Sequence, residues 1–428
     1  MDIQHIKRCL ADQREALENS VKEGKIIKRE DAQRCRTHLA SSLVKVITGP
    51  RRAGKSVLCH ELLSRERFSY VNFDDERFAN LRSEDLNTLL QAIHEIAPGS
   101  HYLFFDEIQN VPHWELFVNR LQRSRYNLVI TGSNAYLLSR ELTTHLTGRH
   151  YQFELFPFSF REYLDFHELQ WKKKIFTTKE VAALKTLLND YIRAGGFPKV
   201  VQGEHYSQYL NALYSSIITK DVALRHKVRS VTALKACANY LLNYFGCQIS
   251  FNALGRALAL PSVHTAQKYV SYLEEAYLIR LVERFSYKPK IRVSAPRKVY
   301  AIDTGLINAV STRFSQDIGH LYENVVAVEL LRKKAQGRFE DVYYWQDSEQ
   351  REVDFVIKTG TRVSALIQVT YDIEDYRTRT REVDALTRAS YALRCNTLFI
   401  ITHDIEKDER IKRKRIRYIP LWKWLLIV

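Results

Sequence analysis

The fold is decided by the run Gly49-Pro50-Arg51-Arg52-Ala53-Gly54-Lys55-Ser56. This run follows an apolar stretch at 44–47 and precedes a stretch with helical spacing at 57–63. A strand, a glycine loop and a helix in this order bind phosphate, because backbone N–H groups of the loop point at the anion. Gly49 and Gly54 permit backbone conformations that a side chain would block.

The side chains of this loop indicate the ligand. Lys55 would place its charge on the β- and γ-phosphates, and the Ser56 hydroxyl can hold Mg²⁺. We therefore predict ATP and Mg²⁺ as cofactors. The alternative is a chance glycine turn before a helix, and a second motif argues against it. The predicted nucleotide-binding residues are Gly49, Pro50, Arg51, Arg52, Ala53, Gly54, Lys55, Ser56 and Val57.

The second motif is an apolar strand, 101–105, that ends in two adjacent carboxylates, Asp106 and Glu107. We expect Asp106 to bind Mg²⁺ together with Ser56. Glu107 is the predicted catalytic residue, because hydrolysis needs a group that polarises the water in line with the γ-phosphate. Taken alone, such a pair is more often a solvated acidic turn. Together with the phosphate loop it predicts an ATPase.

A third strand, 127–131, is followed by Ser133 and Asn134. Asn134 is expected to sense the γ-phosphate or to hold the attacking water, and Ser133 could do the same. A polar turn after a buried strand stays open as the alternative. Ligands of parallel sheets bind at the carboxyl ends of the strands. Gly49, Asp106 and Asn134 should therefore meet at one edge of the sheet.

Two arginines follow the third strand, Arg140 and Arg149. An ATPase of this kind needs an arginine at the γ-phosphate, from the same chain or from a neighbour, to offset developing charge. Arg149 is the first choice and Arg140 the second, although either one could equally be a surface arginine. If Arg149 acts across a subunit boundary, the active form is a homo-oligomer, and we expect a ring such as a hexamer.

Residues 41–157 alternate apolar strands with helical stretches, which predicts an α/β domain with a parallel sheet. Residues 1–40 are polar and helix-prone. Residues 158–227 are expected to be helical, with a break at 194–198. The predicted strands of the parallel sheet are 44–48, 69–73, 101–105, 127–131 and 150–155.

Composition favours a multi-domain protein with a polyanionic partner. A length of 428 residues predicts two or three domains. The formal net charge of +16 favours nucleic acid as a partner, with a basic but non-binding surface as the alternative. The six cysteines are scattered, so we expect neither disulfides nor structural zinc. The sequence shows no signal peptide and no membrane-length apolar run, and we expect a cytoplasmic protein.

Residues 228–297 have the outline of a winged helix. A short helix at 252–260 is followed by Ser262, which is placed to cap a second helix. A strand at 278–285 then ends in a basic turn. The second helix would enter a major groove and the turn would meet phosphates. A winged helix used only for packing stays open as the alternative. The predicted nucleic-acid contacts are Lys268, Lys288 and Lys290.

Residues 298–428 have the layout of a metal-dependent nuclease core. Glu323 lies on a predicted helix and Asp354 on a predicted strand. Such chemistry needs carboxylates for Mg²⁺ and a lysine that assists the water. Gln368 stands where an acid is required, and Thr370 stands where the lysine is required. We therefore treat Glu323, Asp354 and Gln368 as a degenerate nuclease site and expect no nuclease activity.

In their order, these motifs resemble the AAA-type ATPases of archaea and bacteria that carry a C-terminal DUF4143 domain, and the resemblance covers nearly the whole chain. The motifs lie at 49–56, 104–109, 131–134, 146–149, 156–163, 191–198 and 345–355. The resemblance implies an ATPase core, a helical lid, a winged helix and a tail similar to restriction endonucleases, of the PD-(D/E)XK type. Many members have Glu-Val-Lys where this chain has Gln368-Val369-Thr370, which weakens any nuclease inference.

The expected domains are 1–40 (N-terminal helical segment), 41–157 (ATPase core), 158–227 (helical lid), 228–297 (winged helix) and 298–428 (nuclease-like domain). Two functional classes remain open. One is an ATPase coupled to DNA binding or remodelling, for example a motor on duplex or branched DNA. The other is a signalling or scaffold ATPase that acts through a protein partner. The basic charge and the winged helix favour the first.

Overall fold

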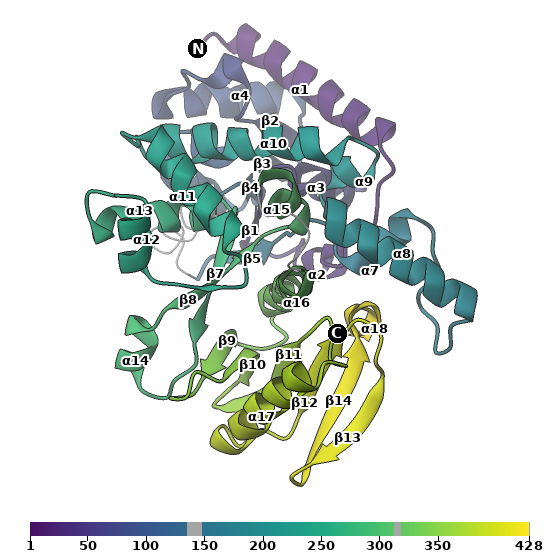
Figure 1. Ribbon diagram of the computed structural model, residues 1–428. Helices are drawn as coiled ribbons and strands as arrows, with labels where there is room; N and C mark the ends of the chain where they lie inside the picture. Colours follow the sequence, from purple (N-terminus) through teal and green to yellow (C-terminus); the bar gives the residue numbers. More distant parts are fainter. Residues whose placement is uncertain (135–147, 312–317, 428) are drawn as a thin grey trace. The chain divides into compact units, whose positions relative to one another are not determined.

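The computed structural model describes residues 1–134, 148–311 and 318–427 (Figure 1). The chain forms two compact units. Unit 1 contains residues 1–156 and 275–277, and unit 2 contains residues 157–274 and 278–428. Within the described ranges, no helix combines the length and the hydropathy needed to span a bilayer.

Unit 1 contains a five-stranded sheet in the order β2-β3-β4-β1-β5, and all its strand pairs are parallel. This confirms the predicted parallel sheet, and each predicted strand is correct to within one residue at either end. The strands are β1 (Val44–Thr48), β2 (Phe68–Asn72), β3 (Tyr102–Asp106), β4 (Asn127–Gly132) and β5 (His150–Glu154).

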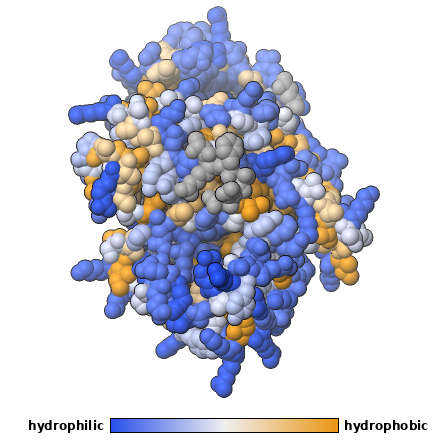
Figure 2. Space-filling model, in the orientation of Figure 1, coloured by the Kyte–Doolittle hydropathy of each residue, from blue (hydrophilic) through white to orange (hydrophobic). Residues whose placement is uncertain are grey.

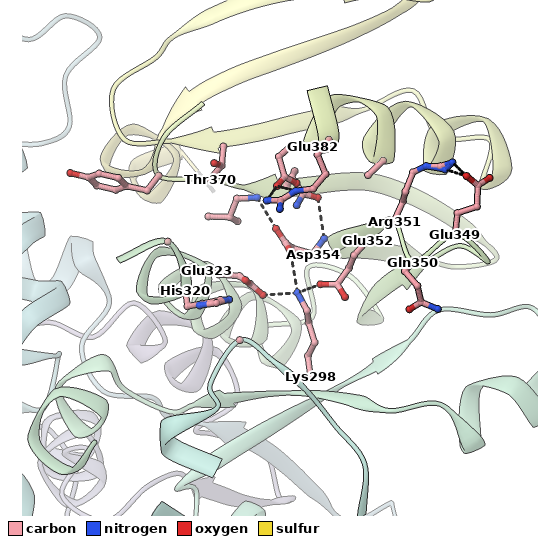
Figure 3. A pocket seen from close by; sticks show the side chains of 17 residues that line it. Lys298, His320, Glu323, Glu349, Gln350, Arg351, Glu352, Asp354, Thr370 and Glu382 are labelled. Carbon is pink, nitrogen blue, oxygen red and sulfur yellow. Dashed lines mark hydrogen bonds and ion pairs between the residues drawn. The ribbon is translucent and has the colours of Figure 1, made fainter. Parts of the chain in front are cut away.

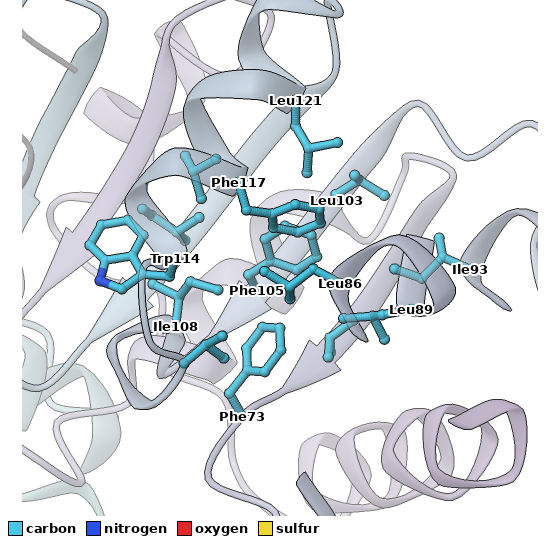
Figure 4. Packing of buried hydrophobic residues seen from close by; sticks show 14 of the residues in the cluster. Phe73, Leu86, Leu89, Ile93, Leu103, Phe105, Ile108, Trp114, Phe117 and Leu121 are labelled. Carbon is cyan, nitrogen blue, oxygen red and sulfur yellow. The ribbon is translucent and has the colours of Figure 1, made fainter. Parts of the chain in front are cut away.

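Helices of unit 1 bury both faces of this sheet. On one face, rings and aliphatic side chains from the strands pack against α1, α4 and α5; Phe105 and Phe117 stack with centroids 5.9 Å apart (Figure 4). Replacing Phe105 by Ala would cost about 3–5 kcal/mol, the usual cost of such a cavity. The other face packs against α2 and α3. The helices are α1 (Ile3–Glu23), α2 (Ala32–Thr37), α3 (Lys55–Leu63), η1 (Glu76–Phe78), η2 (Ser83–Asp85), α4 (Leu86–Ile96), η3 (Ile108–Asn110) and α5 (Trp114–Arg123).

Unit 2 begins with helices, as predicted for 158–227. The break at 194–198 packs against Asp303. Gly196 N donates a hydrogen bond to Asp303 Oδ2 at 2.7 Å. Gly195 (φ +81°) leaves room for the same carboxylate, because a Cβ there would lie 1.9 Å from Asp303 Oδ1. Asp303 also caps α15 by accepting from Gly305 N. These helices are α7 (Phe160–Phe166), α8 (Thr178–Ala194), α9 (Pro198–Val201), α10 (Tyr206–Ser216), the π-helical η4 (Ile217–Leu224), α11 (Val231–Asn243) and α15 (Thr304–Val310).

A nine-stranded sheet runs through the rest of unit 2 in the order β13-β14-β12-β11-β10-β9-β7-β8-β6. The parallel pairing of β7 with β9 joins its two parts. The expected domain boundary between 297 and 298 falls inside β8. The strands are β6 (Gln248–Ile249), β7 (Ile279–Arg284), β8 (Arg297–Ala301), β9 (Asp341–Gln346), β10 (Glu352–Thr359), β11 (Arg362–Val369), β12 (Leu398–Thr402), β13 (Lys407–Ile411) and β14 (Lys414–Pro420).

The helices that accompany this sheet largely follow the sequence pattern. Ser262 Oγ accepts from Thr265 N at 3.1 Å, as expected for a cap of the second helix. One segment differs: the basic turn expected at 288–290 is the start of a short helix, since Pro289 fits the first helical position and Lys288 precedes it. The helices are α12 (Phe251–Ala257), α13 (Val263–Glu275), α14 (Pro289–Ser294), α16 (Ile318–Ala335), α17 (Tyr376–Ala392) and α18 (Leu421–Ile427).

Candidate functional site

The loop between β1 and α3 has the backbone that a phosphate cradle requires. Gly49 has φ +148° and Gly54 has φ +92°, which is the left-handed region where glycine is favoured. A Cβ on Gly49 would lie 2.1 Å from the carbonyl oxygen of Leu155. Because Gly54 is directly followed by α3, the unpaired N–H groups of the first helical turn face the loop.

Lys55 is buried at the centre of this loop, with 4% of its side chain exposed. Its Nζ donates to the carbonyl oxygens of Gly49 and Pro50, each at 3.1 Å, and lies 3.4 Å from Glu107 Oε1. These partners are weaker than a phosphate would be, since two are neutral and the third is distant. The ammonium is therefore available to an incoming anion.

Asp106 ends β3 and meets Ser56, the second residue of α3. Ser56 Oγ donates to Asp106 Oδ2 at 2.6 Å, and the hydroxyls of Tyr70 and Thr131 also donate to this carboxylate. Burial, followed by the nearby charge of Glu107, raises the pKa of Asp106. A hydroxyl and a carboxylate in direct contact are oxygen ligands suited to Mg²⁺, so Ser56 and Asp106 fit the predicted metal role.

Glu107 follows in the left-handed region, with φ +51°. Burial alone would raise the pKa of Glu107, but the Lys55 charge and the hydrogen bond from Gln109 outweigh it and lower that pKa to about 2. Its Oε2 accepts from Gln109 Nε2 at 2.5 Å and from Ser133 N at 3.2 Å. Glu107 is therefore ionised at neutral pH, as a group that polarises water must be.

The end of β4 contributes Ser133 and Asn134, both buried with 1% exposure. Ser133 N contacts Glu107, and Ser133 Oγ has no hydrogen-bond partner among the described residues. The edge of the sheet thus brings together the loop, the two carboxylates and Ser133, in line with the sequence analysis. The roles suggested for Ser133 and Asn134 stay predictions.

Arg149 lies at the other edge of the same sheet. Its carbonyl oxygen accepts from Val44 N, the first residue of β1, whereas the phosphate loop follows the last residue of β1. Five residues of strand separate these ends, a distance of ~15 Å at the usual rise. Its guanidinium donates to Asn119 Oδ1 at 3.2 Å. Arg149 therefore points away from the nucleotide site of its own chain. Arg140 lies outside the described residues.

The three lysines predicted to contact nucleic acid are all exposed. Lys268 lies on α13, and Lys288 and Lys290 lie at the start of α14. The two helices flank β7 in the chain. This strand has six residues, which gives it a length of ~20 Å. The face shown in Figure 2 is mostly hydrophilic, with apolar residues in small separate groups. One such group lies over α14, where Ile291 and Val293 are exposed.

A second candidate site is a cavity of about 680 Å³ in unit 2, lined by residues of α16, α17, β8, β10 and β11 (Figure 3). It contains the three residues of the expected nuclease site. Glu323 comes from α16 and Asp354 from β10. The Oε1 atom of Gln368 accepts from Asp354 N at 3.3 Å, so this amide orients the strand. Thr370 Oγ1 donates to the carbonyl oxygen of Asp372 and is not aimed at a reacting group.

Sequence reasoning missed several charged residues of this cavity, among them Lys298 from β8, Glu352 from β10 and Glu382 from α17. Lys298 Nζ lies 2.8 Å from Glu323 Oε1 and 2.9 Å from Asp354 Oδ1. Burial, then the charge of Asp354, raises the pKa of Glu382 to about 7. A lysine at the start of the otherwise apolar run 298–302 is the signal that could have revealed Lys298. No comparable signal marks Glu382.

Comparison with known proteins gives matches along most of the chain. A family model described as an AAA domain matches residues 41–164, and models described as domains of unknown function match residues 185–317 (DUF8612) and 318–424 (DUF4143). An uncharacterized protein of Methanocaldococcus jannaschii is 35% identical over 95% of this chain and 92% of its own length. An uncharacterized protein of Haemophilus influenzae is 30% identical over 81% of this chain and 86% of its own length.

Among solved structures, a chain from a study of katanin self-assembly aligns with 58% of this chain and 82% of its own length. The sequence identity is 14% and the TM-score is 0.28.

Proposed function

Because the chain belongs to the family of AAA-domain proteins that carry a C-terminal DUF4143 domain, we propose that it hydrolyses ATP and couples hydrolysis to the binding or remodelling of DNA. The observation that carries the first half is an ionised Glu107 beside a buried lysine, at the strand edge where the phosphate loop begins. Lys55 and the loop would hold the phosphates, and Ser56 with Asp106 would hold Mg²⁺, which supplies charge neutralisation when bound.

Glu107→Gln tests the hydrolytic role. The amide keeps the shape and the contact to Ser133 N but loses the charge that polarises water. We expect ATP affinity within a few-fold of wild type and a turnover rate lower by about 10²-fold or more. Glu84→Gln is the matched control and should keep wild-type turnover, because it makes the same change at a glutamate whose side chain is 74% exposed. Wild-type turnover in Glu107→Gln would show that another group activates the water.

We also propose that Arg149 completes the site of a neighbouring chain. This is supported by its position at the edge opposite to its own phosphate loop. Mixing Arg149→Ala chains with Lys55→Ala chains should restore part of the ATPase activity, since a site is complete wherever the intact loop of an Arg149→Ala chain faces the intact arginine of a Lys55→Ala chain. No recovery at any ratio, with co-assembly shown by size, would argue for a site within one chain or for a different arginine.

The DNA half of the proposal is supported by the net charge of +16 and by the exposed lysines of α13 and of the start of α14. Replacing Lys268, Lys288 and Lys290 by Ala should weaken binding to all duplex sequences alike and flatten the dependence of affinity on salt. A matched control replaces three exposed lysines of another segment: Lys172, Lys174 and Lys179. If the triple variant keeps full affinity for DNA, the result favours the alternative function, an ATPase that acts through a protein partner.

Residues 298–428 are proposed to bind or position DNA or a subunit and not to cut DNA. This is supported by the neutral amide at Gln368 and by the hydrogen bond that Thr370 Oγ1 donates to the carbonyl oxygen of Asp372. Purified wild type should leave duplex and single-stranded DNA intact in the presence of Mg²⁺ or Mn²⁺. Cleavage that disappears in Asp354→Ala would overturn this part and leave the ATPase proposal untouched.

A further inference from the structure

Lys298 lies at the centre of the unit 2 cavity, surrounded by carboxylates from three directions (Figure 3). Its Nζ is 2.5 Å from Glu352 Oε1, 2.8 Å from Glu323 Oε1 and 2.9 Å from Asp354 Oδ1. Only 3% of the lysine side chain is exposed. Nζ donates hydrogen bonds to Glu323 and Asp354 and forms an ion pair with Glu352, so its position marks the point on which the three acids converge.

The three carboxylates are held in place by partners other than the lysine. Tyr300 OH donates to Glu323 Oε1 at 2.6 Å, Val369 N donates to Asp354 Oδ2 at 2.9 Å, and Gln248 Nε2 donates to Glu352 Oε2 at 2.5 Å. These donors come from three different strands or strand ends: β8, β11 and β6. The convergence of the acids is thus built into the sheet and does not depend on Lys298 alone.

Acidic side chains outnumber cationic ones around the cavity even with Lys298 present. Its lining contains five carboxyl groups, against the three cationic side chains Lys298, Arg351 and Arg381. This balance disfavours the approach of a phosphate. The lysine itself is paired with three acids at 2.5–2.9 Å.

We propose that the cavity is a cation cage whose resident cation is the ammonium of Lys298, so that the chain itself fills the position at which a divalent metal ion would otherwise bind. The oxygen atoms lie 2.5–2.9 Å from Nζ, the spacing of an ammonium. Ca²⁺ takes carboxylate oxygens at about 2.3–2.6 Å in flexible geometry. Contraction by a few tenths of an ångström would therefore convert the cage into a Ca²⁺ site once the lysine is removed. This inference does not depend on ATP hydrolysis.

Calorimetric titration of the full, nucleotide-free chain with Ca²⁺ at pH 7.5 tests the proposal. Wild type and Lys298→Arg should show the same weak, non-specific binding of Ca²⁺. Lys298→Met, which removes the charge and keeps most of the volume, should gain one site that is at least tenfold tighter. The matched control is Lys298→Met with Asp354→Asn, which should lose that site. A wild-type Ca²⁺ site that Asp354→Asn removes would overturn the proposal, because metal and lysine would then share the cavity.

Lys298→Met leaves buried acids without a counter-ion and could fail to fold. Thermal unfolding with and without millimolar Ca²⁺ covers this case. Ca²⁺ should raise the melting temperature of Lys298→Met, or restore its folding, and leave wild type and the Asp354→Asn double variant unchanged. If Ca²⁺ neither binds to folded Lys298→Met nor restores an unfolded one, the carboxylates do not form a cation cage and the proposal is wrong.

Discussion

The two units each bury a lysine beside carboxylates, and the two lysines are held in opposite ways. Lys55 contacts loop carbonyl oxygens at 3.1 Å and one glutamate at 3.4 Å. Lys298 contacts three carboxylates at 2.5–2.9 Å. Residue type and burial are the same, so the difference lies in the partners. A loosely held ammonium can turn to an incoming anion, whereas an ammonium matched by three acids serves as an internal counter-ion.

The largest expected effect is on turnover. Lys55→Met should abolish ATP hydrolysis, by about 10³-fold or more, because the phosphates lose their buried positive charge. Its unfolding free energy should fall by less than that of Lys298→Met, since Lys55 has one carboxylate partner, Glu107 at 3.4 Å, where Lys298 has three. Steady-state ATPase rates and urea unfolding measure the two quantities. Full turnover in folded Lys55→Met would remove the contrast with Lys298.

Lys298→Met should show the reverse pattern. Removing one partner of a buried ionic cluster leaves uncompensated charge and typically costs about 3–5 kcal/mol. We expect a loss of that order in the unfolding free energy at pH 7.5, while the ATP turnover per folded molecule stays at the wild-type level. A loss below about 1 kcal/mol would mean that the cluster is solvated and that the comparison fails.

A third buried lysine, Lys45 in β1, sharpens the comparison. It donates to the carbonyl oxygen of Ser41 at 2.8 Å, and burial lowers its pKa to about 8. With a pKa lower in the folded than in the unfolded chain, the folded state binds fewer protons, so stability rises with pH between about 8 and the unfolded value of 10.5. Lys45→Met should therefore stabilise the protein at pH 7 by about 1–3 kcal/mol, and the gain should shrink above pH 8. An unfolding free energy of Lys45→Met equal to that of wild type at pH 7 would contradict this prediction.

The smallest expected effect concerns Glu382. Burial and the charge of Asp354 raise the pKa of this carboxyl to about 7. A carboxyl with a raised folded pKa gives stability that is full below its unfolded pKa and is lost as the pH rises through 7. Glu382→Gln should therefore reduce the fall in stability between pH 5 and pH 7.5 by about 1–2 kcal/mol. Glu349→Gln at the exposed rim should leave this slope unchanged. Equal slopes for wild type and Glu382→Gln, measured by urea unfolding, would contradict the prediction.

The meeting of the glycine loop, the two carboxylates and Ser133 at one sheet edge could be predicted, because their strands are apolar and therefore recognisable in the sequence. Each of these groups ends or directly follows a strand, so the parallel sheet brings them to one edge. Lys298 could not be placed in the same way. It lies 56 residues from Asp354, and the two meet only because β8 joins the same sheet through β7 and β9.

One other departure has a local cause. The segment after β7 contains Pro289, which suits a turn and equally suits the first residue of a helix, and the structure adopts the helix. The helix break predicted at 194–198 is correct, but its partner could not be predicted: Gly195 and Gly196 accommodate the carboxylate of Asp303, which is distant in sequence.

The continuity of the nine-stranded sheet has a practical consequence for anyone who divides this chain into fragments. A fragment that starts at residue 298 would lose β6, β7 and the first residue of β8, and a fragment that ends at 297 would lose the partners of β7. Each cut would leave unpaired strand backbone open to solvent, and such edges recruit other chains and aggregate. Precipitation of either fragment should therefore be taken as a sign of a broken sheet. A cut that preserves all nine strands has to leave residues 248–420 intact.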